Sequence, residues 1–254
     1  MLEIVPLQAF KDNYIWTLRN ATHAAVVDPG DAQPVLDYLA REKLVLAAIL
    51  ATHHHPDHVG GIPRLLEAHT APVYGPAGEP IADLTHRVAE GDRVPIPALG
   101  VTFSVLDIPG HTRAHVAYYG AESLFCGDTL FACGCGRVFE GTPEQMYASL
   151  SKLGALPAAT KVYCGHEYTL ANIQFALAVE PGNATLAERE RRERARRASG
   201  VPTLPTTLGE ERATNPFLRC LEPAVVESAN KYLGARLSDP VRVFAAIREW
   251  KNRF

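Results

Sequence analysis

The stretch Thr52-His53-His54-His55-Pro56-Asp57-His58-Val59-Gly60-Gly61 decides the fold, and four of the chain's ten histidines fall in it. Because a residue before proline is pushed out of the helical region, we expect an extended segment here, with His53 and His55 pointing the same way and His54 turned away. Past the proline, Asp57 and His58 can point to a second nearby position. Imidazole and carboxylate suit zinc or a comparable transition metal. The pattern therefore predicts two ligands for each of two adjacent metals, and the alternative is a solvent-exposed histidine-rich loop.

Three further candidate ligands come directly after predicted strands. They are His111 in Pro-Gly-His, Asp128 in Cys-Gly-Asp and His166 in Cys-Gly-His. Ligand sites in open α/β sheets gather at the carboxyl ends of strands, and by that analogy we expect these residues to converge with the histidine-rich stretch.

Residues 1–168 alternate short apolar runs with turns and short helices, which indicates an α/β protein with covered sheets. Asp31 is a plausible N-cap for one helix, and Thr142 offers a capping box for another that ends at Gly154. The predicted strands cover residues 4–7, 14–18, 24–27, 45–50, 101–108, 115–119, 123–126 and 161–164.

The remainder, residues 169–254, differs in both pattern and charge. Its net charge is +4, against −7 for residues 1–168. Helices are predicted over 171–179, over 186–198 and from the Asp239-Pro240 pair to the C-terminus, with a long connection over 199–216. The charged run ERERRERARR at 188–197 could hold anions, but we expect a solvated helix with ion pairs between successive turns. The sequence thus predicts a catalytic domain over 1–168 and a helical domain over 169–254.

Composition excludes several classes of protein. With 47% apolar and 21% charged residues, the chain is typical of a globular protein. A net charge of −3 argues against nucleic acid as a partner, and no stretch predicts a membrane span or a signal peptide. Five cysteines are too few for a disulfide scaffold, so we expect reduced thiols in a cytoplasmic protein.

Longer motifs carry a resemblance to a known family. They are THHHPDHVGG at 52–61, PGHT at 109–112, GDTLF at 127–131, GCGRVFEGT at 134–142, GHEYT at 165–169, NPFLR at 215–219 and the terminal Arg248, Lys251 and Phe254. With these the chain resembles the metallo-β-lactamase fold hydrolases and, more narrowly, the glyoxalase II family. The resemblance implies a four-layered αβ/βα sandwich followed by a small α-helical substrate domain.

The resemblance also implies a dinuclear metal site. It assigns His53, His55 and His111 to one metal and Asp57, His58 and His166 to the other, with Asp128 bridging. Zinc is the expected metal, with iron or manganese as alternatives. A bridging hydroxide, available because a bound metal lowers the pKa of water to about 7, is the expected nucleophile, so Asp57 and Asp128 also count as catalytic.

The implied reaction is hydrolysis of S-2-hydroxyacylglutathione, typically S-D-lactoylglutathione, to glutathione and a hydroxy acid such as D-lactate, the second step of methylglyoxal detoxification. The metal would polarise the thioester carbonyl. Because a free thiol has a pKa of about 8.5, the thiolate leaves without a dedicated general acid.

Five residues are implied to hold the glutathione moiety: Arg137, Phe139, Tyr168, Arg248 and Lys251. Family members carry Lys at the position of Arg137 and Tyr at that of Phe139, so the charge survives here and a hydroxyl contact is lost. Without the resemblance, Arg248 and Lys251 would be interpreted as cations complementing a helix C-terminus.

Some residues near these motifs are ambiguous from sequence. Asp28 and His115 could orient metal ligands, although a turn role explains Asp28 equally well. Cys133 and Cys135 lack the spacing of a structural zinc site, and we interpret them as loop thiols.

Three alternative functions remain open from the sequence. They are a glutathione-persulfide dioxygenase with a single iron, a phosphodiesterase or nuclease using the same metals, and a non-enzymatic module whose metal has no open coordination position. We expect a monomer whose partner is a small glutathione thioester, with neither nucleic acid nor membrane bound.

Overall fold

The computed structural model describes residues 2–254, which divide into two compact units. The first unit comprises residues 2–107 and 112–127, and the second comprises 108–111 and 128–254. The predicted domain boundary at residue 168 stays a prediction. It differs from the division of the chain into these two compact units.

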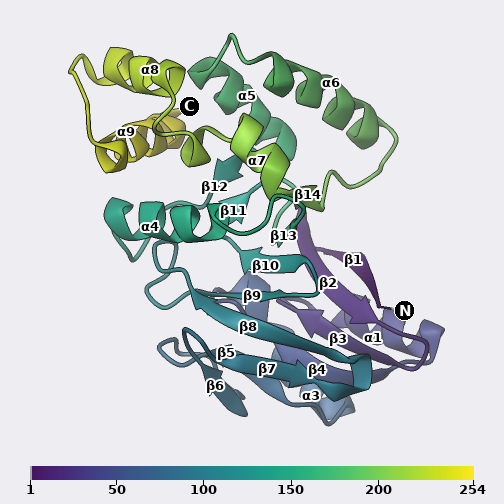
Figure 1. Ribbon diagram of the computed structural model, residues 1–254. Coiled ribbons are helices and arrows are strands. Elements are labelled where there is room, and N and C mark those ends of the chain that lie inside the picture. The colour runs from purple at the N-terminus through teal and green to yellow at the C-terminus, as the bar shows by residue number, and fades with distance from the viewer. Residues whose placement is uncertain (1) are drawn as a thin grey trace. The chain divides into compact units, whose positions relative to one another are not determined.

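The first unit contains a six-stranded mixed sheet with helices on one face (Figure 1). Its strands, in spatial order, are β1 (Glu3–Ala9), β2 (Asn13–Arg19), β3 (His23–Val27), β4 (Val45–Leu50), β5 (Val73–Pro76) and β6 (His86–Val88). The covering helices are α1 (Ala32–Glu42) and α3 (Ile62–Ala68). Asp31 caps α1 as predicted, and its side chain accepts from the Gln33 amide. Val35 and Leu39, on the apolar side of α1, are buried in the hydrophobic core of the first unit. Parallel pairing of β3, β4, β5 and β6 buries β4, which leads into the histidine-rich stretch.

A second, antiparallel group of strands completes the first unit. It runs β7 (Arg93–Ile96), β8 (Val101–Asp107), β9 (Val116–Gly120) and β10 (Ser123–Gly127), with a 3₁₀ turn η1 (Pro97–Leu99) before β8. The Tyr118 hydroxyl donates to the Ala51 carbonyl at 2.8 Å, and the Val116 amide donates to the Thr52 carbonyl at 3.0 Å. These bonds fix the carboxyl end of β4 against the start of β9.

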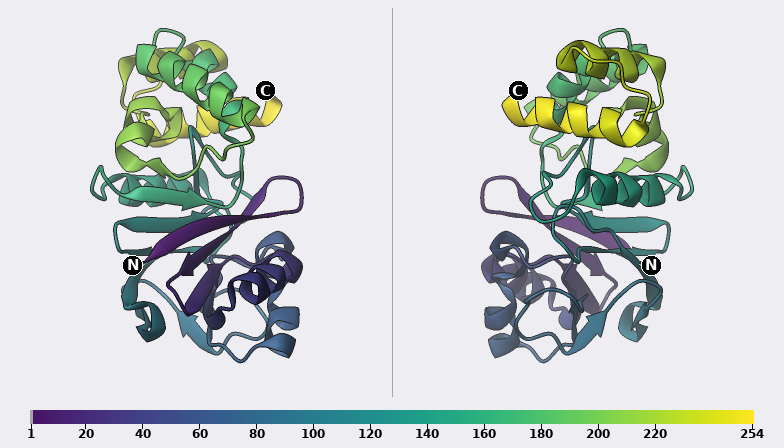
Figure 2. Two further views of the ribbon diagram at one scale, coloured as in Figure 1. Left: turned by 90° about the vertical axis from the view of Figure 1, so that its right-hand side faces the viewer. Right: turned by 90° about the vertical axis from the view of Figure 1, so that its left-hand side faces the viewer.

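The second unit is mostly helical (Figure 2). Its elements are β11 (Leu130–Phe131), β12 (Gly134–Cys135), α4 (Pro143–Gly154), β13 (Lys161–Cys164), α5 (Thr169–Val179), α6 (Ala184–Ala198), β14 (Thr206–Thr207), α7 (Leu208–Thr214), η2 (Pro216–Leu218), α8 (Pro223–Leu233) and α9 (Pro240–Arg253). Buried aromatic rings form its core: Phe217 lies 6.0 Å from Phe175 and 5.8 Å from Phe244, measured between ring centroids. The predicted α/β class, with helices dominating the C-terminal part, is confirmed.

Two local expectations for this part of the chain are wrong. The stretch 199–216 is not a plain connection, because it contains β14 and α7, and Thr207 caps α7 by accepting from the Glu210 amide. The charged helix α6 is not wholly solvated, because Arg189 and Glu193 are each only 1% exposed. Its exposed face does carry the expected ion pairs, including Arg194 with Glu190 at 2.7 Å. Across residues 2–254, none of the helices combines the length and apolar composition that crossing a bilayer requires.

Candidate functional site

The histidine-rich stretch forms a tight loop at the end of β4, in the first unit. His55 is extended, with φ −60° and ψ 140°, as the sequence predicts. The short helix α2 (Pro56–Val59), which was not predicted, begins at the proline. The Nε2 atom of His53 lies 3.1 Å from the Nδ1 atom of His55, so the two rings present nitrogens to one point.

Asp57 and His58 form the second half of this loop. The Nε2 atom of His58 lies 3.6 Å from Oδ2 of Asp57, and Asn13 donates to that oxygen at 3.0 Å. Gly30 makes the arrangement possible, because a Cβ atom there would lie 1.9 Å from the Asp57 carbonyl oxygen. Only glycine lets the two backbones approach so closely.

A buried carboxylate supports His58 from behind. Asp28 lies in the left-handed region at φ 53°, which aspartate tolerates better than most residues. It accepts from the amide and the hydroxyl of Thr52, both at 2.7 Å, and lies 3.0 Å from Nδ1 of His58. Such a contact fixes the proton on Nδ1 and leaves Nε2 for a metal, which is how residues behind a ligand orient it.

Two more residues pack against the loop. His115 is fully buried, and its ring stacks on that of His53 with 4.5 Å between centroids. The His54 ring turns to Glu79, with Nδ1 lying 2.7 Å from its Oε2. Glu79 was not predicted from the sequence, because it lies in an Ala-Gly-Glu-Pro turn far along the chain from these partners.

The other predicted ligands come together in the second unit. Oδ2 of Asp128 lies 3.2 Å from Nε2 of His166 and 3.6 Å from Nε2 of His111, and all three residues are buried. The Arg137 carbonyl accepts from Nδ1 of His111 at 2.9 Å. Gly136 allows this packing, since a Cβ atom there would lie 1.9 Å from the Asp128 carbonyl oxygen.

The donor sets in both units fit a divalent metal. Ligands at 2.0–2.1 Å around a tetrahedral ion lie about 3.4 Å from one another. The ligand-to-ligand distances within the first unit are 3.1 and 3.6 Å, and within the second unit they are 3.2 and 3.6 Å. Imidazole and carboxylate donors at these separations match what such an ion requires, and the chain binds divalent metal.

A cavity of about 390 Å³ lies in the second unit beside Asp128. It is lined by His111, Asp128, Phe131, Gly136, Arg137, Phe139 and Tyr168. The Tyr168 ring stacks on the His166 ring, 4.7 Å away and nearly parallel, while Phe139 is 61% exposed at the rim. Three of the five predicted glutathione-binding residues therefore line one cavity together with two predicted metal ligands.

Among the described residues, Arg248 and Lys251 do not line this cavity. Arg248 is 6% exposed and donates to the Cys135 carbonyl at 2.8 Å. Lys251 donates to the Asn172 side chain, and its ammonium lies 5.6 Å from the Phe175 ring centroid. Burial, with the nearby Arg248 cation, lowers the pKa of Lys251 to about 8. The Cys135 thiol is buried and its pKa is raised, so it is not a reactive loop thiol.

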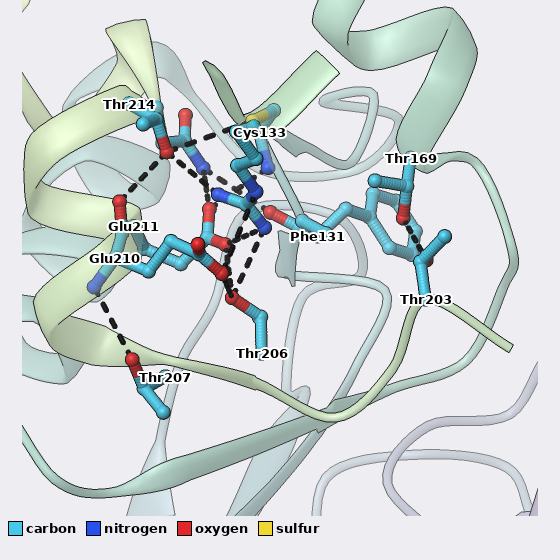
Figure 3. A network of polar contacts seen from close by, with 12 residues as sticks. Phe131, Cys133, Thr169, Thr203, Thr206, Thr207, Glu210, Glu211 and Thr214 are labelled. Atoms are coloured by element: carbon cyan, nitrogen blue, oxygen red, sulfur yellow. Dashed lines mark hydrogen bonds and ion pairs between the residues drawn. The ribbon is translucent and has the colours of Figure 1, made fainter. Parts of the chain in front are cut away.

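A buried polar network holds the segment around β11 and β12 in place (Figure 3). The Glu211 carboxylate accepts from Arg189 at 2.6 Å and from the Cys133 amide at 2.8 Å. Asn215 donates to the same carboxylate and to the carbonyls of Phe131 and Gly134. Because Phe131 lines the cavity, this network supports one of its walls.

Two family models match consecutive parts of the chain. Residues 11–166 match the metallo-beta-lactamase superfamily, and residues 167–254 match the model described as hydroxyacylglutathione hydrolase C-terminus.

Relatives and a solved structure are similar over most or all of the chain. The protein named Hydroxyacylglutathione hydrolase of Nitrosomonas eutropha is 55% identical over 100% of both chains, and its namesake from Alkalilimnicola ehrlichii is 56% identical over 100% of both. A crystal structure titled TTHA1623 in a di-iron-bound form is 29% identical with a TM-score of 0.59, over 85% of this chain and 100% of that one.

Proposed function

The chain belongs to the hydroxyacylglutathione hydrolases of the metallo-beta-lactamase superfamily, and from that premise we propose how its residues hydrolyse the thioester. The enzyme is a thioester hydrolase acting on hydroxyacylglutathione. Full-length relatives with that name favour this activity over the dioxygenase and phosphodiesterase alternatives.

The seven candidate ligands would hold two divalent ions. His53, His55 and His111 would serve one ion and Asp57, His58 and His166 the other, with Asp128 as the shared ligand. The ligand-to-ligand distances within each unit support a dinuclear centre, as does the di-iron-bound form of a similar solved structure. Zinc suits this imidazole and carboxylate set, and iron or manganese also suit it.

Bound ions would supply a water whose pKa is lowered toward neutrality and an electrophile for the thioester carbonyl. Asp128 has His111 at 3.6 Å and His166 at 3.2 Å, which fixes its Oδ2 atom at the cavity wall. Asp28 holds the Nδ1 proton of His58, so that Nε2 stays available as a ligand atom.

The cavity beside Asp128 receives the substrate. Arg137 carries the charge that a glutathione carboxylate requires, and Tyr168 and Phe139 offer apolar ring surface. Arg248 and Lys251 provide further positive charge for the second carboxylate. Lys251 has its pKa lowered to about 8 by burial, so near neutral pH it keeps most of its charge for an anion.

The observation that carries this proposal is that Asp128 and His111 line the same cavity as Arg137 and Tyr168. Purified protein loaded with zinc should release thiol from S-D-lactoylglutathione. Asp128→Asn should lower kcat at least about a hundredfold, because one removed ligand or charge contact in such a site costs about 10²–10³ in rate. Asp37→Asn, an exposed change on α1, is the matched control and should keep full activity. Full activity of Asp128→Asn would exclude the proposed ligand role.

A further inference from the structure

Glu79 is a buried acidic residue outside the predicted ligand set. It lies between β5 and β6 in the first unit and is 4% exposed. A buried carboxylate is costly unless hydrogen bonds satisfy it, so its contacts show which parts of the fold need it.

Both oxygens of Glu79 accept hydrogen bonds, and each serves a different segment. Oε2 accepts from the His54 amide at 2.6 Å and from Nδ1 of the same residue at 2.7 Å. Oε1 accepts from the Thr112 hydroxyl and from the Ala114 amide at 3.2 Å. One side chain thus joins segments that lie 25 residues before it and 33–35 residues after it in sequence.

These two segments lie next to proposed metal ligands in the sequence. His54 stands between His53 and His55, and Thr112 follows His111 directly in the chain. A hydrogen bond to the His54 amide fixes the backbone between two ligands. The hydrogen bonds from Thr112 and Ala114 fix the backbone that directly follows the third ligand, His111.

We propose that Glu79 is a positioning residue that sets the metal affinity of the enzyme, which rests on the proposed dinuclear function. It acts through His54, Thr112 and Ala114, and it touches no reacting group. A hydrogen bond to a charged carboxylate is stronger than one between neutral groups, so Glu79 holds both segments firmly in place. Residues behind metal ligands typically change metal affinity about 10–100-fold when replaced.

Glu79→Gln tests this role with little change of shape. A carboxylate accepts at both oxygens, whereas an amide carries two N–H donors on one side. One of the two segments therefore faces a donor instead of an acceptor. We expect competition with a chelator to show zinc affinity lowered about 10–100-fold, while KM for S-D-lactoylglutathione at saturating zinc changes less than about twofold.

Two further variants keep the test decisive. Asp37→Asn is the matched control in the same unit, because its carboxylate is exposed on α1 and accepts from the Gln33 side chain, and it should keep wild-type zinc affinity. Thr112→Val removes the hydroxyl that donates to Glu79 and should lower zinc affinity about threefold to tenfold, with Thr112→Ser restoring it.

The outcomes separate this proposal from the proposed function. Wild-type zinc affinity in a folded Glu79→Gln protein overturns the positioning role alone. If Glu79→Gln does not fold, wild-type zinc affinity in Thr112→Val overturns it. A wild-type chain that retains no divalent metal overturns the dinuclear function as well, whereas a chain that binds metal without cleaving the thioester leaves the chelator test of Glu79 intact.

Discussion

A pair of buried carboxylates in the first unit and a pair in the second unit have different partners. Asp28 and Glu79 in the first unit, each 4% exposed, accept from histidine, threonine and backbone donors. Glu211 and Glu180 in the second unit, 0% and 3% exposed, pair with the guanidinium groups of Arg189 and Arg219. Carboxylates of the first kind orient histidines, while those of the second kind neutralise arginines that are buried or half-buried. We therefore expect changes to the first kind to appear in metal binding and changes to the second kind to appear in stability.

The largest expected effect is on the stability of the second unit. Glu211→Gln leaves Arg189, 1% exposed, without its closest counter-charge, and breaking a buried ion pair costs about 3–5 kcal/mol. Urea unfolding should show that loss. Glu188→Gln removes an exposed ion pair with Arg191 on α6, the helix that also carries Arg189. It should lower the free energy of unfolding by under about 1 kcal/mol. Equal losses in both variants would break the comparison.

A smaller effect is expected from Asp28→Asn in the first unit. Asparagine tolerates the left-handed backbone at this position, so the change tests the carboxylate rather than the turn. The amide no longer accepts from both Thr52 and His58, and zinc affinity should fall about 10–100-fold. Chelator competition measures this, with Asp37→Asn as control. If Asp28→Asn instead lowers stability as much as Glu211→Gln with unchanged zinc affinity, the distinction between the units is wrong.

Lys251→Ala tests whether this residue of the second unit binds the substrate. This residue would hold a part of the substrate remote from the thioester, so its loss should raise KM about tenfold and change kcat little. Steady-state kinetics with S-D-lactoylglutathione measures both. Arg253→Ala removes an exposed cation on the same helix and should leave KM unchanged. An unchanged KM in Lys251→Ala refutes the role.

The smallest expected effect is the pH dependence of that binding. Because the pKa of Lys251 is lowered to about 8, its charge is present below pH 8 and is lost above it. KM should rise about threefold between pH 8 and pH 9, because the charged fraction falls from about one half to about one tenth and the uncharged form binds about tenfold more weakly. The same shift makes the unfolded chain bind more protons between pH 8 and 10.5, so this group makes stability rise with pH there. Lys251→Arg stays charged and should show a flat KM, whereas a flat wild-type profile would contradict the assignment.

Much of the first unit could be predicted because its signals are local. Strand β4, the Asp31 cap and the proline after His55 all lie within a few residues of what they determine. The extended geometry of His55 follows from that proline. In the second unit the capping box at Thr142 is equally local and was predicted.

The residues that escaped prediction depend on contacts between distant parts of the chain. Glu79 has no local pattern, because its partners are 25 to 35 residues away. Burial of Arg189 inside a charged helix depends on Glu211 and Thr206 from later segments. Helix α8 was not predicted, although its sequence carries local helix signals: Pro223 in the first turn and Gly234 in the left-handed region at its end.

Stepwise metal loading tests the dinuclear centre most directly. Metal-free protein is titrated with Zn²⁺ while hydrolysis of S-D-lactoylglutathione is followed. We predict that activity rises to a plateau at two equivalents per chain. A plateau at one equivalent, or no thioester hydrolysis with two equivalents bound, would contradict the seven-ligand assignment and its role in catalysis.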